Sequence, residues 1–325
     1  HWEGLPLLGA TVRSYPFEKP FRLEDSMVAT ATLTAAGLVG SYHLPGLNDI
    51  DHAMLVSPQG ERSSVELVDG KLKVSSTQLS NSELDASTTV MDGEAIRRLA
   101  FVNSLLSRNE NQTVTFPSRY TLLVWSSPLD LGFAFPGDSN KIGSALTAIP
   151  LHVENTKPET QFVVPSIYQQ YDVVSANGIG ASFAYDNVKS KWVREPHNSQ
   201  HHFWIRTKVP VSVLPAKITK ATVLMDISAG GRPVDSVGGA FDAEGRIIPE
   251  IIATIQSPNA AIEFVFDDVA HLNVDQHGYL YLGFNVGLDP IEGETREAMR
   301  ARDTNYSWFI RDVDISLEGE TLARP

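Results

Sequence analysis

The sequence predicts an all-β protein of two β-sandwich (jelly-roll-like) domains, with one short helix near residues 92–108. Runs of alternating apolar and polar residues recur along the 325 residues, and turn-forming residues separate them about every ten positions. Only one segment has the spacing of an amphipathic helix. A chain of this length is more typical of two domains than of one. We therefore expect an N-terminal domain over residues 1–160 and a C-terminal domain over residues 161–325, divided at a polar turn.

Strands are expected from the beginning of the N-terminal half. Residues 26–34 alternate and are rich in small and β-branched side chains. Residues 65–74 contain two alternating runs joined by Asp69-Gly70. Asp-Gly is a preferred two-residue hairpin turn, because both central positions adopt positive φ. Further strands are expected over residues 120–125 and 148–154.

The single helix has a clear beginning. Asp92 is placed to cap its first turn, and apolar side chains at Ile96, Leu99 and Leu106 follow at helical spacing. Arg97 and Arg98 fall on the other face of this helix. Such a helix within a β chain is expected to close one end of a sandwich or to cross between sheets.

The C-terminal half shows the strand pattern more regularly. Alternating runs cover residues 203–213, 217–227, 262–266, 279–286 and 307–318, and residues 241–247 suggest a short hairpin. In the last run the odd positions from Phe309 are apolar except for Arg311. That alternation places Arg311 among the inward side chains, so we expect it to be buried and paired with an acid, or to lie at an edge or interface.

The closing run Trp308-Phe309-Ile310-Arg311-Asp312-Val313-Asp314-Ile315-Ser316-Leu317 resembles the last strand of galactose-binding-like jelly rolls, as found in many carbohydrate-binding modules. In that family an Asp often precedes the Asp-Val pair, whereas this chain has Arg311 there. The resemblance covers about a dozen residues. It implies a jelly roll for the C-terminal half, and it transfers no sugar-binding residue.

Composition excludes several classes of function. The chain has no cysteine, which removes disulfides, thiolate metal sites and cysteine nucleophiles. Its net charge of −13 disfavours nucleic acid as a partner. No apolar run approaches the roughly 20 residues of a membrane-spanning helix. The sequence begins at His1 rather than Met, which we interpret as a processed N-terminus of an extracellular, cell-surface or virion protein.

Several groups of residues are candidate metal sites. His1 could bind copper through its amine and imidazole. Asp267, Asp268, His271 and Asp275 could hold a structural calcium. Apart from this calcium, and from copper in the His1 alternative, we expect no cofactor. His197, His201 and His202 could chelate a metal only on a helix, and the neighbouring residues favour a loop. A polar group around Pro45-Gly46 could bind calcium or zinc, or form Asx-type turns; its members are His43, Asn48, Asp49, Asp51 and His52.

Among the aromatic residues, Trp192, Trp204 and Tyr185 are the candidates for a sugar-stacking platform. No nucleophile elbow or phosphate-binding glycine loop is present in the sequence, which favours a function without catalysis. Three hypotheses follow. The protein is a structural subunit that associates with itself or with other subunits of a virion or cell surface, a carbohydrate-binding extracellular protein, or a glycan-active enzyme, including one with copper at His1.

Overall fold

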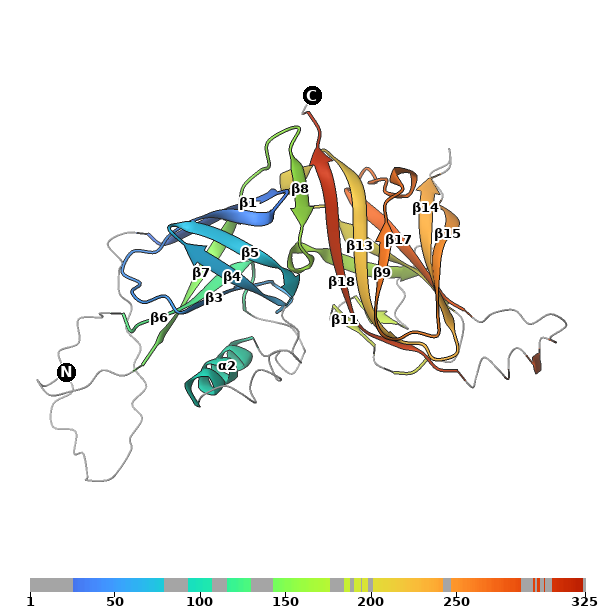
Figure 1. Ribbon diagram of the computed structural model, residues 1–325, viewed down its shortest axis with the longest axis horizontal. Coiled ribbons are helices and arrows are strands. Elements are labelled where there is room, and N and C mark those ends of the chain that lie inside the picture. Colours follow the sequence, from blue (N-terminus) through green and yellow to red (C-terminus); the bar gives the residue numbers. More distant parts are fainter. Residues whose placement is uncertain are drawn as a thin grey trace, which may run out of the picture.

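The computed structural model describes residues 26–78, 93–106, 116–129, 143–175, 184–187, 190–193, 195–197, 201–241, 247–287, 295, 297–298, 301 and 306–323. The described strands form a closed barrel in the N-terminal half and two facing sheets in the C-terminal half (Figure 1). The predicted all-β class with one short helix is confirmed. None of the described helices is long and apolar enough to cross a membrane.

The N-terminal half is a seven-stranded barrel in the order β1-β2-β5-β4-β3-β6-β7. Its strands are β1 (Val28–Thr34), β2 (Gly37–His43), β3 (His52–Val56), β4 (Arg62–Val68), β5 (Lys71–Gln78), β6 (Thr121–Ser126) and β7 (Ala145–Val153). Neighbours are antiparallel except β1 and β7, whose parallel pairing closes the barrel. The prediction of a sandwich in this half is therefore wrong, because closure joins the first and last strands of a single sheet.

The predicted hairpin is confirmed at the β4–β5 turn. Val68 pairs with Lys71, and the two turn residues Asp69 and Gly70 have φ values of 50° and 75°. Apolar side chains from all sides of the barrel fill its interior, among them Leu33, Leu55 and Leu122. The barrel is thus a packed core.

Helix α2 (Gly93–Leu105) lies beneath the barrel (Figure 1). It shares a small apolar cluster with the outside of β3 and β6, formed by Val56, Val102, Leu106, Leu123 and Trp125. Arg62 on β4 also donates a hydrogen bond to Asn103 Oδ1 of the helix at 2.8 Å. The helix is therefore packed onto the barrel wall.

The buried face of α2 agrees only in part with the face that its apolar spacing predicts, since Leu106 is buried but Ile96 is not. Ile96 and Phe101 are 45% and 54% exposed, whereas Val102 is buried. Arg98 faces the barrel, where it pairs with Asp51 and lies over the Trp125 ring. The ion pair and the ring contact both require Arg98 on the inner side, and this orientation leaves Ile96 and Phe101 outside.

The C-terminal half is a β-sandwich of a five-stranded sheet, β15-β14-β17-β12-β9, and a four-stranded sheet, β16-β13-β18-β8. Its strands are β8 (Gln161–Val164), β9 (Gln170–Ser175), β12 (His201–Lys208), β13 (Ala216–Ser228), β14 (Pro233–Phe241), β15 (Ile247–Gln256), β16 (Asn259–Phe266), β17 (Tyr279–Val286) and β18 (Phe309–Thr321). All pairs are antiparallel. A small hairpin, β10 (Tyr185–Asp186) with β11 (Lys191–Trp192), and three short 3-10 helices, η1 (Ser166–Tyr168), η2 (Val211–Val213) and η3 (Val269–His271), complete the half.

Strand β18 carries an extra residue at Arg311. Asp312 pairs with Asp226 but Ile310 pairs with Ile227, so the register shifts by one at this point. Such a bulge reverses the inward and outward alternation, and Ile310 is buried where Arg311 was expected. The expected pairing of Arg311 with an acid is confirmed, because Nη1 donates to Asp226 Oδ1 at 2.7 Å. The expected burial is wrong, since the Arg311 side chain is 37% exposed.

The two halves are continuous through their apolar cores. Strand β8 lies against β1 and β2, and the rings of Tyr120 and Tyr168 stack at the junction with centroids 4.3 Å apart. The last barrel strand ends at Val153 and the first sandwich strand begins at Gln161. A division into two independent domains at residue 160 stays a prediction.

Candidate functional site

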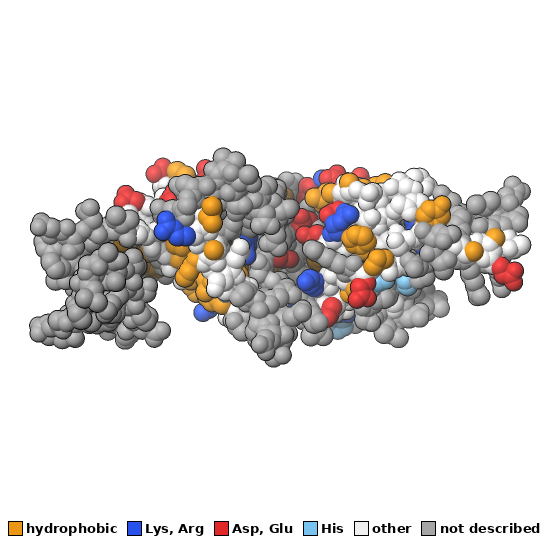
Figure 2. All heavy atoms as spheres, turned by 90° about the horizontal axis from the view of Figure 1, so that it is seen from below, with side chains coloured by type: hydrophobic (Ala, Val, Ile, Leu, Met, Phe, Trp, Pro, Cys, Tyr) orange, Lys and Arg blue, Asp and Glu red, His pale blue; other side chains and the backbone are white. Residues whose placement is uncertain are grey.

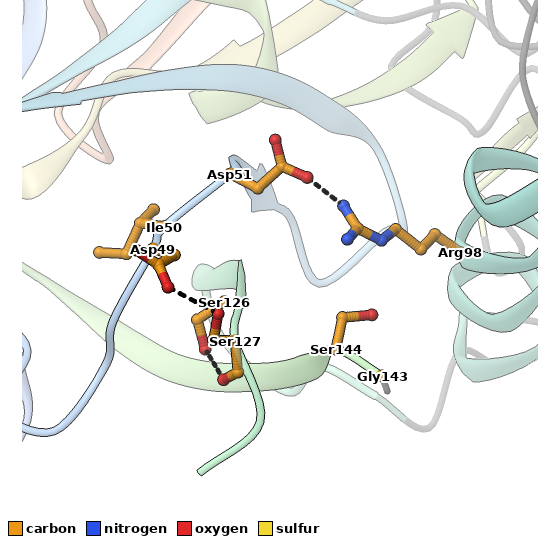
Figure 3. A pocket seen from close by; sticks show the side chains of 8 residues that line it. All are labelled: Asp49, Ile50, Asp51, Arg98, Ser126, Ser127, Gly143 and Ser144. Atoms are coloured by element: carbon orange, nitrogen blue, oxygen red, sulfur yellow. Dashed lines mark hydrogen bonds and ion pairs between the residues drawn. The ribbon is translucent and has the colours of Figure 1, made fainter. Parts of the chain in front are cut away.

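A polar pocket of about 370 Å³ lies at one end of the barrel, beside α2 (Figure 3). The loop before β3, the helix, the end of β6 and the residues before β7 converge on it. Its lining residues are Asp49, Ile50, Asp51, Arg98, Ser126, Ser127, Gly143 and Ser144.

Local hydrogen bonds hold the acidic side of the pocket in place. The backbone N–H of Asp51 donates to the Trp125 carbonyl, and that of Ser127 donates to the Asn48 carbonyl, each at 3.0 Å. Asp49 has a φ of 49°, a left-handed conformation that Asp adopts more readily than most residues. Ser127 Oγ donates to Asp49 Oδ2 at 2.9 Å. The loop before β3 is thus tied to the end of β6, and the expected Asx-type turns stay a prediction.

Arg98 forms the opposite side of the pocket. Its guanidinium donates to Asp51 Oδ2 and lies 5.2 Å from the centroid of the Trp125 ring. The hydrogen bond from Arg98 is the main reason that the pKa of Asp51 lies below its ordinary value, and the charges of His52 and Arg98 act in the same direction. Asp51 therefore carries a negative charge at neutral pH, when it can accept hydrogen bonds but cannot act as a general acid.

The lining chemistry of the pocket is polar. Its described residues offer two carboxylates, one guanidinium and three serine hydroxyls. Carboxylates accept hydrogen bonds from hydroxyl groups, and serine hydroxyls can donate or accept. Such a set matches a ligand rich in hydroxyl groups.

The three aromatic residues predicted to stack on sugars are buried. Trp192, Trp204 and Tyr185 are only 5%, 3% and 3% exposed. Tyr185 and Trp192 pack edge to face within the β10–β11 hairpin, with centroids 5.0 Å apart. Their ring faces are used for core packing, so the structure corrects the prediction of a sugar platform at these positions.

The aspartates of the predicted calcium site have local roles. Asp268 Oδ1 accepts a hydrogen bond from the backbone N–H of Ala270 at 2.9 Å and so caps η3. Asp275 Oδ1 accepts from the backbone N–H of Tyr279 at 2.9 Å across a turn. Asp267 is exposed. Turn and cap chemistry accounts for two of these three side chains.

The fourth predicted calcium ligand, His271, is buried against β14. A side chain at Gly238 would meet its ring at 2.5 Å, and its Nε2 lies 3.5 Å from Glu250 Oε2. Across the described ranges, no three His, Asp or Glu side chains are grouped to hold a metal ion. The calcium site stays a prediction.

The other metal candidates are placed as follows. His1 lies outside the described residues. His197 forms an isolated bridge with Trp308, and His201 is the first residue of β12, so the two do not form a helical chelate. Burial lowers the pKa of His197, against the opposing charge of Glu195. His202 is the second residue of β12, and its pKa is likewise lowered by burial.

A second candidate site is the outer strand of the five-stranded sheet. Among the described strands, β15 pairs with β14 alone, and it lies at the right-hand edge of the sandwich in Figure 1. Ile248, Ile251 and Ile252 on this strand are 55%, 62% and 37% exposed. We call these three residues the Ile edge. Large exposed apolar side chains that are grouped on one element are typical of interaction surfaces.

Sequence reasoning found one of these two sites in part. The acidic half of the pocket was visible as Asp49 and Asp51 in a polar loop, but Arg98 reaches it from a helix 47 residues further along the chain. The Ile edge was missed. A signal for it exists, because no Lys or Arg occurs between Ile247 and Thr295, and edge strands are commonly protected by lysine.

Comparison with known proteins does not assign the chain to a family. No family model matches the chain, and no curated protein matches its sequence. One similar solved structure belongs to work on the promiscuous specificity of carbohydrate-binding modules from the β-sandwich superfamily. It has a TM-score of 0.21 and 7% identity over 92% of this chain and 98% of the other. Another is infectious bursal disease virus, Gt strain, with a TM-score of 0.20 and 12% identity over 88% of this chain. The matched region spans 59% of that viral chain. At such TM-scores neither likeness carries an argument about this protein.

Proposed function

We propose that the chain is a non-catalytic structural subunit of a larger assembly, at the surface of a virion or a cell. The observation that carries this proposal is the Ile edge, a strand whose isoleucines are 55%, 62% and 37% exposed. Burying one such side chain completely contributes about 1.5–3 kcal/mol. Because these side chains are already partly buried, a partner that covers them gains only part of this, so a stable contact would include further side chains around the Ile edge.

The chemistry of the pocket supports the same proposal. Asp51 has a lowered pKa and is paired with Arg98. A general acid that works near neutral pH needs a raised carboxyl pKa, which is the opposite arrangement.

The proposal is tested in the material that naturally contains the protein. The wild-type chain should be recovered in complexes or particles much larger than one chain, as measured by size-exclusion chromatography with light scattering and by electron microscopy. Ile251→Asp should remain with the single-chain fraction while its unfolding temperature stays unchanged, because Ile251 is 62% exposed. A wild-type chain found only as a free monomer in that material contradicts the proposal.

A second candidate function is carbohydrate binding, and the polar pocket is the observation that favours it. Asp51 and Arg98 can bond to the hydroxyl groups of a sugar, and Trp125 beneath Arg98 is a fluorescent reporter of binding. A glycan array probed with the wild-type chain and with Asp51→Ala tests this function. Binding that is lost in the variant supports it, and an array without any binding removes it.

A further inference from the structure

The two sheets of the sandwich have β15, β9, β16 and β8 as their outer strands, and three of these are protected against the addition of a further strand. On β15, Pro249 lacks the N–H that strand pairing requires, and Ile252 is an extra residue in the register with β14. On β9, the Asn187 side chain occupies the backbone of Val173. Its Oδ1 accepts from the Val173 N–H at 2.9 Å, and its Nδ2 donates to the Val173 carbonyl at 3.0 Å. Strand β8 lies against β1 and β2 of the barrel.

In the described part of the chain, β16 is the outer strand without such protection. Its residues include no Pro, Lys or Arg, and they pair with β13 without a register shift. The other side of β16 therefore offers backbone N–H and C=O groups to a further strand. Charged side chains of both signs are visible on the underside of the sandwich (Figure 2), whereas β16 carries a single charge, at Glu263.

The inward side chains of β16 are only in part covered by the single chain. Phe264 and Phe266 point inward and are buried. Ile262 and Ala260 point inward as well, because side chains alternate along a strand, yet Ile262 is partly buried and Ala260 is exposed. A strand added beside β16 would cover both of these side chains.

We propose that β16 pairs antiparallel with β16 of a second copy of this chain, about a two-fold axis. This inference rests on the proposed assembly function and names a partner for a surface other than the Ile edge. Because the contact occupies β16 and the other outer strands are protected, association through strand pairing ends at a dimer. A single pair of strands is a small interface, so we expect a weak dimer that dissociates into single chains when dilute.

Charge and strand length select the register of this pair. Directly opposite residues share a face of the sheet, so the axis passes through a residue. Two registers pair nearly the whole strand, and the one centred on Glu263 places two like charges opposite each other, which is destabilising. The other is centred on Ile262. It places Ile262 opposite Ile262, Ala261 opposite Glu263, and Ala260 opposite Phe264, so it avoids the like-charge contact and pairs a small inward side chain with a large one.

Charge substitutions at Ala261 test this register with the purified full chain. In sedimentation velocity up to about 1 mM, the wild type should form a dimer. Ala261→Lys should tighten the dimer and Ala261→Glu should weaken it, each by roughly two- to thirtyfold, because the new charge meets Glu263 twice in the symmetric pair. Val211→Lys and Val211→Glu are the matched controls. Val211 is 70% exposed on η2, which contacts β1, and the same changes of charge there should leave the dimer unaltered.

A charge exchange separates this effect from changes within one chain. Asp226 on β13 lies opposite Ala261, so Ala261→Glu also acts on its own sheet. Adding Glu263→Lys to Ala261→Glu should restore the dimer, because unlike charges then meet again across the two-fold axis. Unfolding temperatures of all variants check that the fold is kept.

Single cysteines locate the axis, because the chain has no cysteine of its own. Ile262→Cys places two thiols directly opposite each other, where Cα atoms about 4.5–5.5 Å apart allow a disulfide. Mild oxidation should therefore link this variant into a covalent dimer. Val265→Cys is the control, since its copy lies roughly 20 Å away along the pair. It should form a link only when it is mixed with Asn259→Cys, the position opposite.

Three outcomes overturn the inference: a wild-type chain that stays monomeric up to about 1 mM, a dimer whose strength does not depend on the charge at position 261, and a dimer that Ile262→Cys does not link. Ile251→Asp separates the inference from the Ile edge, because this variant should still dimerise when concentrated. A purified chain that is monomeric but is recovered in natural complexes removes the β16 dimer and supports the assembly function. A β16 dimer without natural complexes does the reverse.

Discussion

Strands β15 and β18 belong to the same sandwich, but β18 is half buried and β15 is largely exposed. Strand β18 has neighbours on both sides, β13 and β8, and buries every second side chain from Val313 to Thr321. Strand β15 has one neighbour, and its side chains from Ile248 to Thr254 are all exposed. Yet β15 contains more isoleucine than β18. The number of neighbouring strands and the face that is covered decide burial, and apolar content alone does not.

The largest expected effect comes from changing the register of β18. Deletion of Ser316 moves one side of the strand by a residue and turns its buried side chains outward. We expect this variant to be unfolded or insoluble. Deletion of Arg311 instead removes the extra residue of the bulge and leaves Ile310 opposite Ile227, so it should fold with a loss of about 1–3 kcal/mol. Circular dichroism and urea unfolding of the two deletions provide the comparison. Equal damage from both contradicts the bulge as the origin of the reversed alternation.

A matched pair of isoleucine-to-alanine substitutions sharpens the comparison of the two strands. Ile315 on β18 is 1% exposed and Ile251 on β15 is 62% exposed. Ile315→Ala should lower the free energy of unfolding by about 2–5 kcal/mol, because it leaves a cavity in the core. Ile251→Ala should change it by less than about 0.5 kcal/mol. Urea unfolding at low protein concentration measures both without interference from self-association. A large loss in Ile251→Ala shows that β15 is covered within the single chain.

The alternating pattern of β18 was enough to predict a buried strand, but it could not predict the bulge. Its sequence reads as continuous alternation through Arg311, and the shift shows only in the pairing with β13. Helix α2 likewise could be predicted in its range but not in its orientation. Its range follows from the spacing of its own residues, whereas its orientation depends on Asp51 and Trp125, which lie far from it in sequence.

Other features depend on long-range pairing and could not be predicted from the sequence for the same reason. The barrel closes because β1 pairs with β7, more than a hundred residues away, and no local pattern distinguishes that closure from an open sandwich. Trp192 and Trp204 have the residue types of a sugar platform, but their burial comes from sheets that assemble around them. The exposure of β15 follows from its edge position, which the sequence shows only indirectly through the missing Lys and Arg.

A smaller effect on the free energy of unfolding is expected from the ion pair at the bulge. Arg311 and Asp226 form an ion pair with side chains 37% and 38% exposed. Because water competes for both groups, Arg311→Ala should lower the free energy of unfolding by at most about 1 kcal/mol. A double-mutant cycle with Asp226→Ala isolates the pair from the packing of Arg311 over the Phe309 ring. A coupling energy several times larger than about 1 kcal/mol shows that the ion pair holds the bulge in place.

The smallest expected effect concerns the corresponding pair in the barrel, Asp51 with Arg98. Its contribution is small because the Asp51 side chain is 51% exposed. The pKa of Asp51 in the folded state lies below its ordinary value of 3.8, chiefly because Arg98 donates a hydrogen bond to it. The pair therefore stabilises the fold fully above about pH 4, and this contribution is lost as the pH falls through the lowered pKa.

Asp51→Asn tests this dependence, because the amide keeps the shape of the side chain and removes its charge. The wild type should be slightly more stable than the variant at pH 7, and the difference should shrink as the pH falls below about 4. Urea midpoints of the two proteins at a series of pH values measure it. A difference between wild type and Asp51→Asn that is constant from pH 7 to pH 3 shows that the charge of Asp51 does not hold α2 against the barrel.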